Sequence, residues 1–141
     1  MATFADYVVL QPGTIELGFG TNDYVQNFDF KLPDDYRRGT DVARPLLAYI
    51  VKASGKTSVG VYVNPSGRTN VPPGTSVFDL TDATFWNTWS GGGPQFDRAL
   101  WDAIDGRLLN AGSNNTIYFR VVEGNIHLRD VVLWFQRGTA G

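Results

Sequence analysis

The sequence predicts an all-β fold, an antiparallel β-sandwich that carries one or two short helical segments. Glutamate occurs only at positions 16 and 123, and lysine only at positions 31, 52 and 56, so the charged residues that favour helices are nearly missing. Aromatic residues make up 13% of the chain, and 16 glycines and 7 prolines supply turns. Turn residues recur about every ten positions, which is the spacing of short strands in a sandwich or barrel. We therefore expect one domain over residues 1–141 with about eight to ten strands.

Alternation of apolar and polar residues places most of the strands. Residues 14–19 put Ile15, Leu17 and Phe19 on one face, which is typical of a half-buried strand of an antiparallel sheet. Residues 46–51 form a continuous apolar run instead, which indicates a central strand covered on both faces. The expected strands before position 81 are 7–10, 14–19, 25–32, 46–51, 58–63 and 76–80.

Two segments between Thr81 and Asp105 have a different period. In residues 81–89 a threonine precedes aromatic residues spaced four apart, at 85 and 89, and a run of three glycines follows; this favours one or two helical turns. In residues 96–105 positions 96, 100 and 104 line one helical face, although alternation there also fits a strand. We predict a short helix for each segment.

The C-terminal third has the clearest pattern. Residues 116–122 alternate as a strand, and residues 126–137 follow after a turn at 123–125. The apolar phase of the second segment breaks near Asp130, which indicates a bulge or bend. Before these strands, Gly112 allows a positive φ, and Asn114 or Asn115 can bond its own turn.

The same third carries a family resemblance. Residues 108–121, which read LLNAGSNNTIYFRV, and residues 126–134, which read IHLRDVVLW, resemble the closing strands of galactose-binding-like jelly-roll β-sandwiches and related carbohydrate-binding modules. The resemblance implies a jelly-roll-type sandwich. It leaves the function open, because this architecture serves lectins, enzyme accessory domains, adhesins, viral coats and tail proteins.

Composition excludes several classes of function. A formal net charge of −2 gives no general reason to bind nucleic acid or an anionic membrane. The absence of cysteine excludes a disulfide framework and thiolate chemistry, and a single histidine excludes a histidine-rich metal site. We expect no membrane insertion, because no apolar run approaches the ~20 residues that span a bilayer. The first residues carry no signal-peptide pattern, which leaves cytoplasmic synthesis with use in the cytoplasm, outside the cell or in a particle.

Carbohydrate recognition is the function that the aromatic residues favour. Sugar sites combine an aromatic platform with planar hydrogen-bonding side chains. Trp86 and Trp89, which precede the run of three glycines, could instead cap the end of the core. Helical spacing favours burial of Trp89, which leaves Trp86 as the more exposed ring. Trp101 and Trp134 are expected in the core. The candidate ligand-binding residues are Trp86, Asn87, Trp89, Tyr24, Tyr36 and Arg38.

Metal binding and catalysis find less support. Asp34, Asp35 and Asp41 could supply hard oxygen ligands to Ca²⁺, but we favour a solvated loop in which neighbouring arginines pair with them. His127 alternates with apolar neighbours, so it is expected to face solvent or a strand neighbour. No nucleophile elbow of the form Gly-x-Ser-x-Gly is present. We expect no cofactor and no enzymatic activity.

Two functions remain after these exclusions. The first is a non-catalytic recognition module for carbohydrate. The second is a self-assembling structural subunit of a virion, tail, filament or adhesin, because only 18% of residues are charged and an uncharged surface costs little to desolvate against copies of itself. A homo-oligomer is expected in the second case.

Overall fold

Strands make up almost all of the structure, a computed structural model that describes residues 3–18, 25–37, 42–64, 83–89 and 98–138. Every strand pairing in the described part is antiparallel. Two strands are much longer than the others, β5 with 18 residues and β8 with 25. In chain order the elements are β1 (Thr3–Gln11), β2 (Ile15–Leu17), β3 (Val25–Lys31), β4 (Tyr36–Arg37), β5 (Leu46–Val63), β6 (Ala83–Trp89), β7 (Arg98–Ala103), a 3₁₀ helix (Gly106–Leu108) and β8 (Asn114–Gly138).

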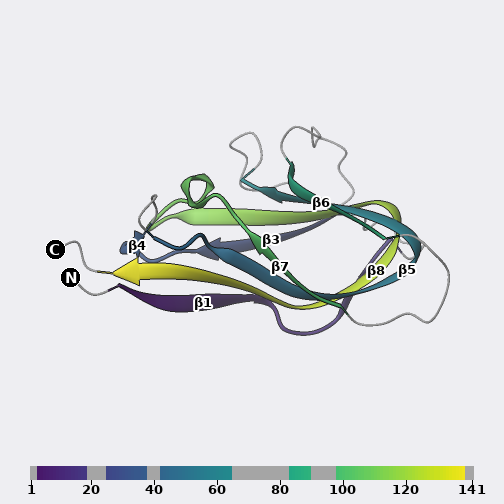
Figure 1. Cartoon of the computed structure of the whole chain (residues 1–141), viewed down its shortest axis with the longest axis horizontal. Coiled ribbons are helices and arrows are strands. Elements are labelled where there is room, and N and C mark those ends of the chain that lie inside the picture. The colour runs from purple at the N-terminus through teal and green to yellow at the C-terminus, as the bar shows by residue number, and fades with distance from the viewer. Residues whose placement is uncertain (1–2, 19–24, 38–41, 65–82, 90–97, 139–141) are drawn as a thin grey trace.

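The two long strands bend, and each contributes one half to each layer of a sandwich (Figure 1). We call the first layer the β1 layer; it consists of β1, the second half of β8 (126–138), the first half of β5 (46–54) and β7, in that order. We call the second layer the β3 layer; it consists of β3, the first half of β8 (114–123), the second half of β5 (57–63) and β6. The short strands β2 and β4 pair with β8.

The strand order is that of a jelly roll. If the halves of β5 and β8 are counted separately along the chain and the short strands β2 and β4 are left out, the β1 layer reads 1-8-3-6 and the β3 layer reads 2-7-4-5. Successive strands thus alternate between the layers, except for the fourth and fifth, which are neighbours in the β3 layer. The predicted all-β sandwich is confirmed.

The backbone of β8 takes conformations that few residues adopt at two places, the bend between the layers and an irregularity within its second half. Gly124 has φ of 82°, and a Cβ added there would lie 2.4 Å from both the carbonyl oxygen of Lys56 and Oγ1 of Thr57. Only glycine fits this close approach of β8 to β5. Asp130 has φ of 52°, and the pairing of β1 with β8 shifts register between Val9 and Gln11. The predicted phase break near Asp130 is confirmed as a bulge.

The turn that leads into β8 is fixed by a buried asparagine. Gly112 has φ of 62°, and the Asn115 side chain is fully buried. Oδ1 of Asn115 accepts hydrogen bonds from the backbone N–H of Asn110 at 2.7 Å and from Nδ2 of Asn64 at 3.0 Å. Its Nδ2 donates to the carbonyl oxygens of Asn110 and Ser113. Of the two asparagines considered from the sequence, Asn115 is therefore the one that closes the turn.

The core fills the space between the layers. Leu47 and Leu133 contribute from the β1 layer and Phe119 from the β3 layer, all with no exposed surface. The Tyr49 ring packs edge-on against Phe119 with centroids 5.1 Å apart. A second, smaller cluster of Val25, Tyr62 and Tyr118 is buried on the opposite face of the β3 layer.

Both predicted helices are wrong. Residues 83–89 form β6, whose Phe85 pairs with Val61 of β5, and residues 98–103 form β7, whose Leu100 pairs with Tyr49. Their apolar residues fit a strand as well as a helical turn, and pairing with β5 decides for the strand. The only helical element among the described residues is the 3₁₀ turn 106–108, whose backbone the Asp105 side chain caps. The strand expected at 76–80 lies outside the described residues.

The described part contains no helix of the length and apolar character that a bilayer span needs.

Candidate functional site

Exposed aromatic residues gather on the outer face of the β1 layer. Tyr7, Trp134 and Leu46 are consecutive cross-strand partners across three strands, and the next outward row includes Val9 and Trp101. The exposed fractions are 53% for Tyr7, 37% for Trp134 and 58% for Trp101. Leu46 and Val9 are also exposed, at 37% and 47%. We call the surface formed by Tyr7, Val9, Leu46, Trp101 and Trp134 the aromatic face.

Strand alternation explains why these rings face outward. Leu133 and Phe135 both enter the core, so Trp134 between them must lie on the other face of β8. Leu100 packs against the core in the same way, which turns Trp101 outward. The prediction that Trp101 and Trp134 are core residues is therefore wrong. The rings of Tyr7 and Trp134 pack against each other with centroids 4.9 Å apart, which holds them in place on the surface.

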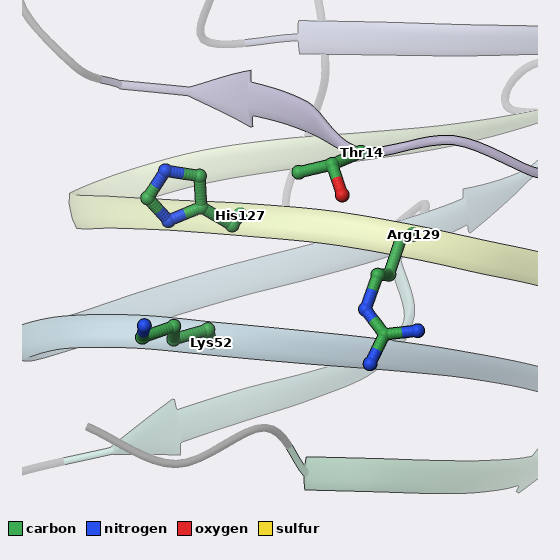
Figure 2. Close-up of a pocket in the computed structure, with 4 residues that line it drawn as sticks. All are labelled: Thr14, Lys52, His127 and Arg129. Carbon is green, nitrogen blue, oxygen red and sulfur yellow. The ribbon is translucent and has the colours of Figure 1, made fainter.

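A polar pocket of about 240 Å³ is lined by residues of the same outer face, further along β5 and β8. Its described lining residues are Thr14, Lys52, His127 and Arg129. Figure 2 shows His127 and Arg129 on β8, Lys52 on the neighbouring β5 and Thr14 just before β2, around one open space. Lys52 is the cross-strand partner of His127, so the two side chains share a face.

Two of the three basic side chains at this pocket have acidic partners. Nε2 of His127 lies 3.1 Å from Oε1 of Glu16 on β2, which confirms that His127 faces a strand neighbour. Arg129 forms an ion pair with Asp130 through Nη1. Lys52 is half-buried and forms no ion pair with any residue in the described ranges. The pocket therefore holds one cation whose charge the described protein does not balance.

The residues predicted for the sugar site are not brought together with the aromatic face. Trp86, Asn87 and Trp89 lie on β6 in the β3 layer, where they pair with positions 60, 59 and 57 of β5. Tyr24 and Arg38 lie outside the described residues.

Tyr36 belongs to the core instead. Its ring is only 6% exposed, packs edge-on against Phe135 at 6.1 Å, and its hydroxyl donates to the carbonyl oxygen of Gly106 at 2.9 Å. A ring in this position has no face for a sugar, so Tyr36 is withdrawn as a ligand-binding residue.

The aspartates considered for Ca²⁺ are only partly described. Oδ1 of Asp35 accepts a hydrogen bond from Nε of Arg137 at 2.9 Å, and Arg137 also reaches Asp6 at 3.1 Å. The N–H of Tyr7 and the Arg137 guanidinium both hold the pKa of Asp6 below its ordinary value.

Of the other two aspartates, the structure describes only Asp34. Asp34 is exposed, and Asp41 lies outside the described residues. No group of three or more potential metal-ligating side chains occurs within the described ranges.

Sequence comparisons leave the family open. Neither a protein-family model nor a curated protein matches this chain. Among solved structures, the chain is similar to part of the crystal structure of dimeric latent PorU from Porphyromonas gingivalis, with a TM-score of 0.60 and 10% sequence identity. The match covers 97% of this chain and 13% of that protein. At this identity the likeness shows the fold, and the chain corresponds to about an eighth of the length of PorU.

Proposed function

We propose that this chain is a non-catalytic carbohydrate-binding module that holds a glycan chain on the aromatic face. The observation that carries the proposal is the exposure of Tyr7, Trp101 and Trp134 on one face of one layer. The apolar C–H faces of sugar rings stack on such rings, and contiguous exposed apolar surface marks a binding site more often than chance. The jelly-roll order is consistent with this function, since carbohydrate-binding modules use it, but it does not specify it.

The spacing of the rings favours an extended ligand. Trp134 and Trp101 lie on β8 and β7, with β5 between them, and they occupy adjacent outward rows. Strands lie about 4.8 Å apart, so the two columns are separated by roughly 10 Å. A single sugar ring cannot stack on both tryptophans at once. An oligosaccharide that crosses the strands can.

A second candidate function is self-association through the same face. The observation that favours it is the aliphatic surface between the rings, because Val9 and Leu46 are exposed and offer a sugar no hydrogen bond. Two copies could bury these residues face to face in an isologous dimer. The two candidates share a surface and differ in their occupant, so one set of variants tests both.

The test is glycan-array screening followed by isothermal titration calorimetry on the chain and on two variants, Trp101→Ala and Trp134→Ala. Each substitution should weaken glycan binding at least about tenfold, because central aromatic residues dominate such interfaces. Trp86→Ala is the control, since position 86 lies in the β3 layer. Circular dichroism confirms that each variant is folded. The proposal fails if no glycan binds, or if only Trp86→Ala weakens binding.

Light scattering after size-exclusion chromatography tests the second candidate. A dimer at micromolar concentration that Trp101→Ala converts to a monomer would favour self-association. A monomer at all concentrations would exclude it.

A further inference from the structure

We propose that the pocket of Thr14, Lys52, His127 and Arg129 binds an acidic substituent, a carboxylate or a sulfate ester, of the glycan that lies on the aromatic face. This inference rests on the proposed function. It assigns a ligand class to a pocket that the aromatic residues alone do not explain.

The pocket continues the aromatic face along the strands. On β5 the outward positions run from Leu46 through Ala48 and Ile50 to Lys52, and Ala48 pairs with Trp101. Four residues along a strand span about 13 Å. A glycan chain that stacks on Trp101 can therefore reach Lys52 within a few sugar units.

The charges at the pocket favour an anion. Three of its four described lining residues are basic, and none is acidic. Glu16 and Asp130 stand beside it and pair with His127 and Arg129, so these carboxylates fix the two side chains. The Arg129 guanidinium has five N–H donors, and it is Nη1 that donates to Asp130.

Lys52 supplies the unbalanced charge. The side chain is half-buried, and half-buried cations are usually paired. No described residue provides a carboxylate for it, whereas Lys56 on the same strand lies 3.9 Å from Glu123. The hydroxyl of Thr14 adds a neutral donor across the pocket. An anionic group placed here would meet Lys52, Arg129 and Thr14 together.

The size of the pocket limits what enters it. A volume of about 240 Å³ is below the range of roughly 300–1,000 Å³ that is typical of sites for whole small molecules. It admits one charged substituent with part of its sugar ring. The rest of the glycan then lies outside the pocket, and the aromatic face further along the same strands is the surface that we propose for it.

The test compares three probes that differ in charge: neutral galactan oligosaccharides, oligogalacturonates that carry carboxylates, and carrageenan oligosaccharides that carry sulfate esters. Calorimetry should show at least about tenfold tighter binding of one acidic probe than of galactan, because a charge-assisted hydrogen bond contributes that much. Which acidic probe binds distinguishes the carboxylate from the sulfate. Lys52→Met should remove the preference, and Lys56→Met, which lies on the same strand, should retain it.

The outcomes separate this inference from the proposed function. Equal binding of neutral and acidic probes, weakened by Trp101→Ala, overturns the inference and leaves the function standing. If none of the three probes binds, titration with inorganic sulfate followed by NMR of the His127 ring decides about the pocket. Saturable changes in the His127 chemical shifts that Lys52→Met abolishes would support an anion site that does not require the glycan. If the His127 chemical shifts do not change, the anion site is overturned as well.

Discussion

The outer faces of the two layers are built from the same two long strands, yet they differ in exposure. On the β1 layer Trp134 of β8 and its partner Leu46 of β5 are both 37% exposed. On the β3 layer the corresponding pair, Tyr118 of β8 and Tyr62 of β5, has no exposed surface. Of these two outward-facing pairs, the one in the β3 layer is thus buried and the one in the β1 layer is left open.

This difference supports the proposal that the aromatic face is a binding surface. Burial of an apolar side chain contributes roughly 1.5–3 kcal/mol, and Tyr62 and Tyr118 gain that contribution within the fold. The rings of the aromatic face are only partly buried, so they gain only part of this stabilising contribution. Their exposed apolar surface also lowers the solubility of the protein. A binding partner that covers the face would recover the rest.

Tyr118→Ala is the substitution with the largest expected effect. It removes a fully buried ring and should lower the free energy of unfolding by about 3–5 kcal/mol, as for other large aromatic residues. Tyr7→Ala on the aromatic face is the control and should cost below about 1 kcal/mol. Urea denaturation measures both. Equal losses would show that the two outer faces do not differ in the way that their exposures indicate.

Gly124→Ala tests the bend that joins the layers and should cost about 2–3 kcal/mol. An alanine there would adopt an unfavourable positive φ, and its Cβ would press on Lys56 and Thr57. Gly13→Ala is the matched control, because the nearest atom to its Cβ would lie at 3.9 Å. Thermal unfolding of both variants checks this. A neutral Gly124→Ala would mean that the bend relaxes freely.

Trp101→Thr should change the free energy of unfolding by less than about 1 kcal/mol, because the ring is mostly exposed and threonine favours strands. The same substitution should raise solubility, since it removes the most exposed large ring of the aromatic face. Denaturation and static light scattering measure the two effects. A loss of stability as large as that of Tyr118→Ala would assign Trp101 to the core.

The smallest effect is expected at Asp105, which lies between β7 and the 3₁₀ turn. Hydrogen bonds from the Arg107 side chain and backbone lower the pKa of Asp105 from 3.8 to about 2. A lowered pKa stabilises the fold above the ordinary value, and this contribution disappears as the pH falls through about 2. Asp105→Asn keeps an oxygen that can cap the turn. Its melting temperature should lie slightly below that of the unchanged chain at pH 5 and match it near pH 2.

Sequence patterns predicted the class of fold and its C-terminal strands because alternation and turn residues are local signals. They misassigned residues 83–89 and 98–103, because spacings of two and of four both fit these short apolar segments, and pairing with β5 decides between them. Trp134 was misplaced for a related reason. Both of its neighbours are apolar, so the sequence does not say which face of β8 turns inward.

The candidate site was less predictable than the fold. His127 was placed correctly against a strand neighbour, since its own segment alternates. The pocket, however, joins Thr14, Lys52 and Arg129, which only the register of β2, β5 and β8 brings together. Local periodicity contains no information about that register. For the rings of the aromatic face the sequence offered only a weak signal of exposure. Each ring occupies a strand position that alternates with core residues, and this alternation alone does not say which of the two sets faces outward.

The long β8 strand has a consequence for how the chain folds. The strands β1, β2, β3 and β4 all pair with β8, which follows them by most of the chain length. None of these pairs can form on a ribosome until the segment of β8 that takes part in it has emerged. Such a high contact order predicts slow folding, in milliseconds to seconds, and an interval in which β1 and β3 have no partner. During synthesis Trp101 can take its place once β7 pairs with the earlier β5, whereas Trp134 has to wait for β8.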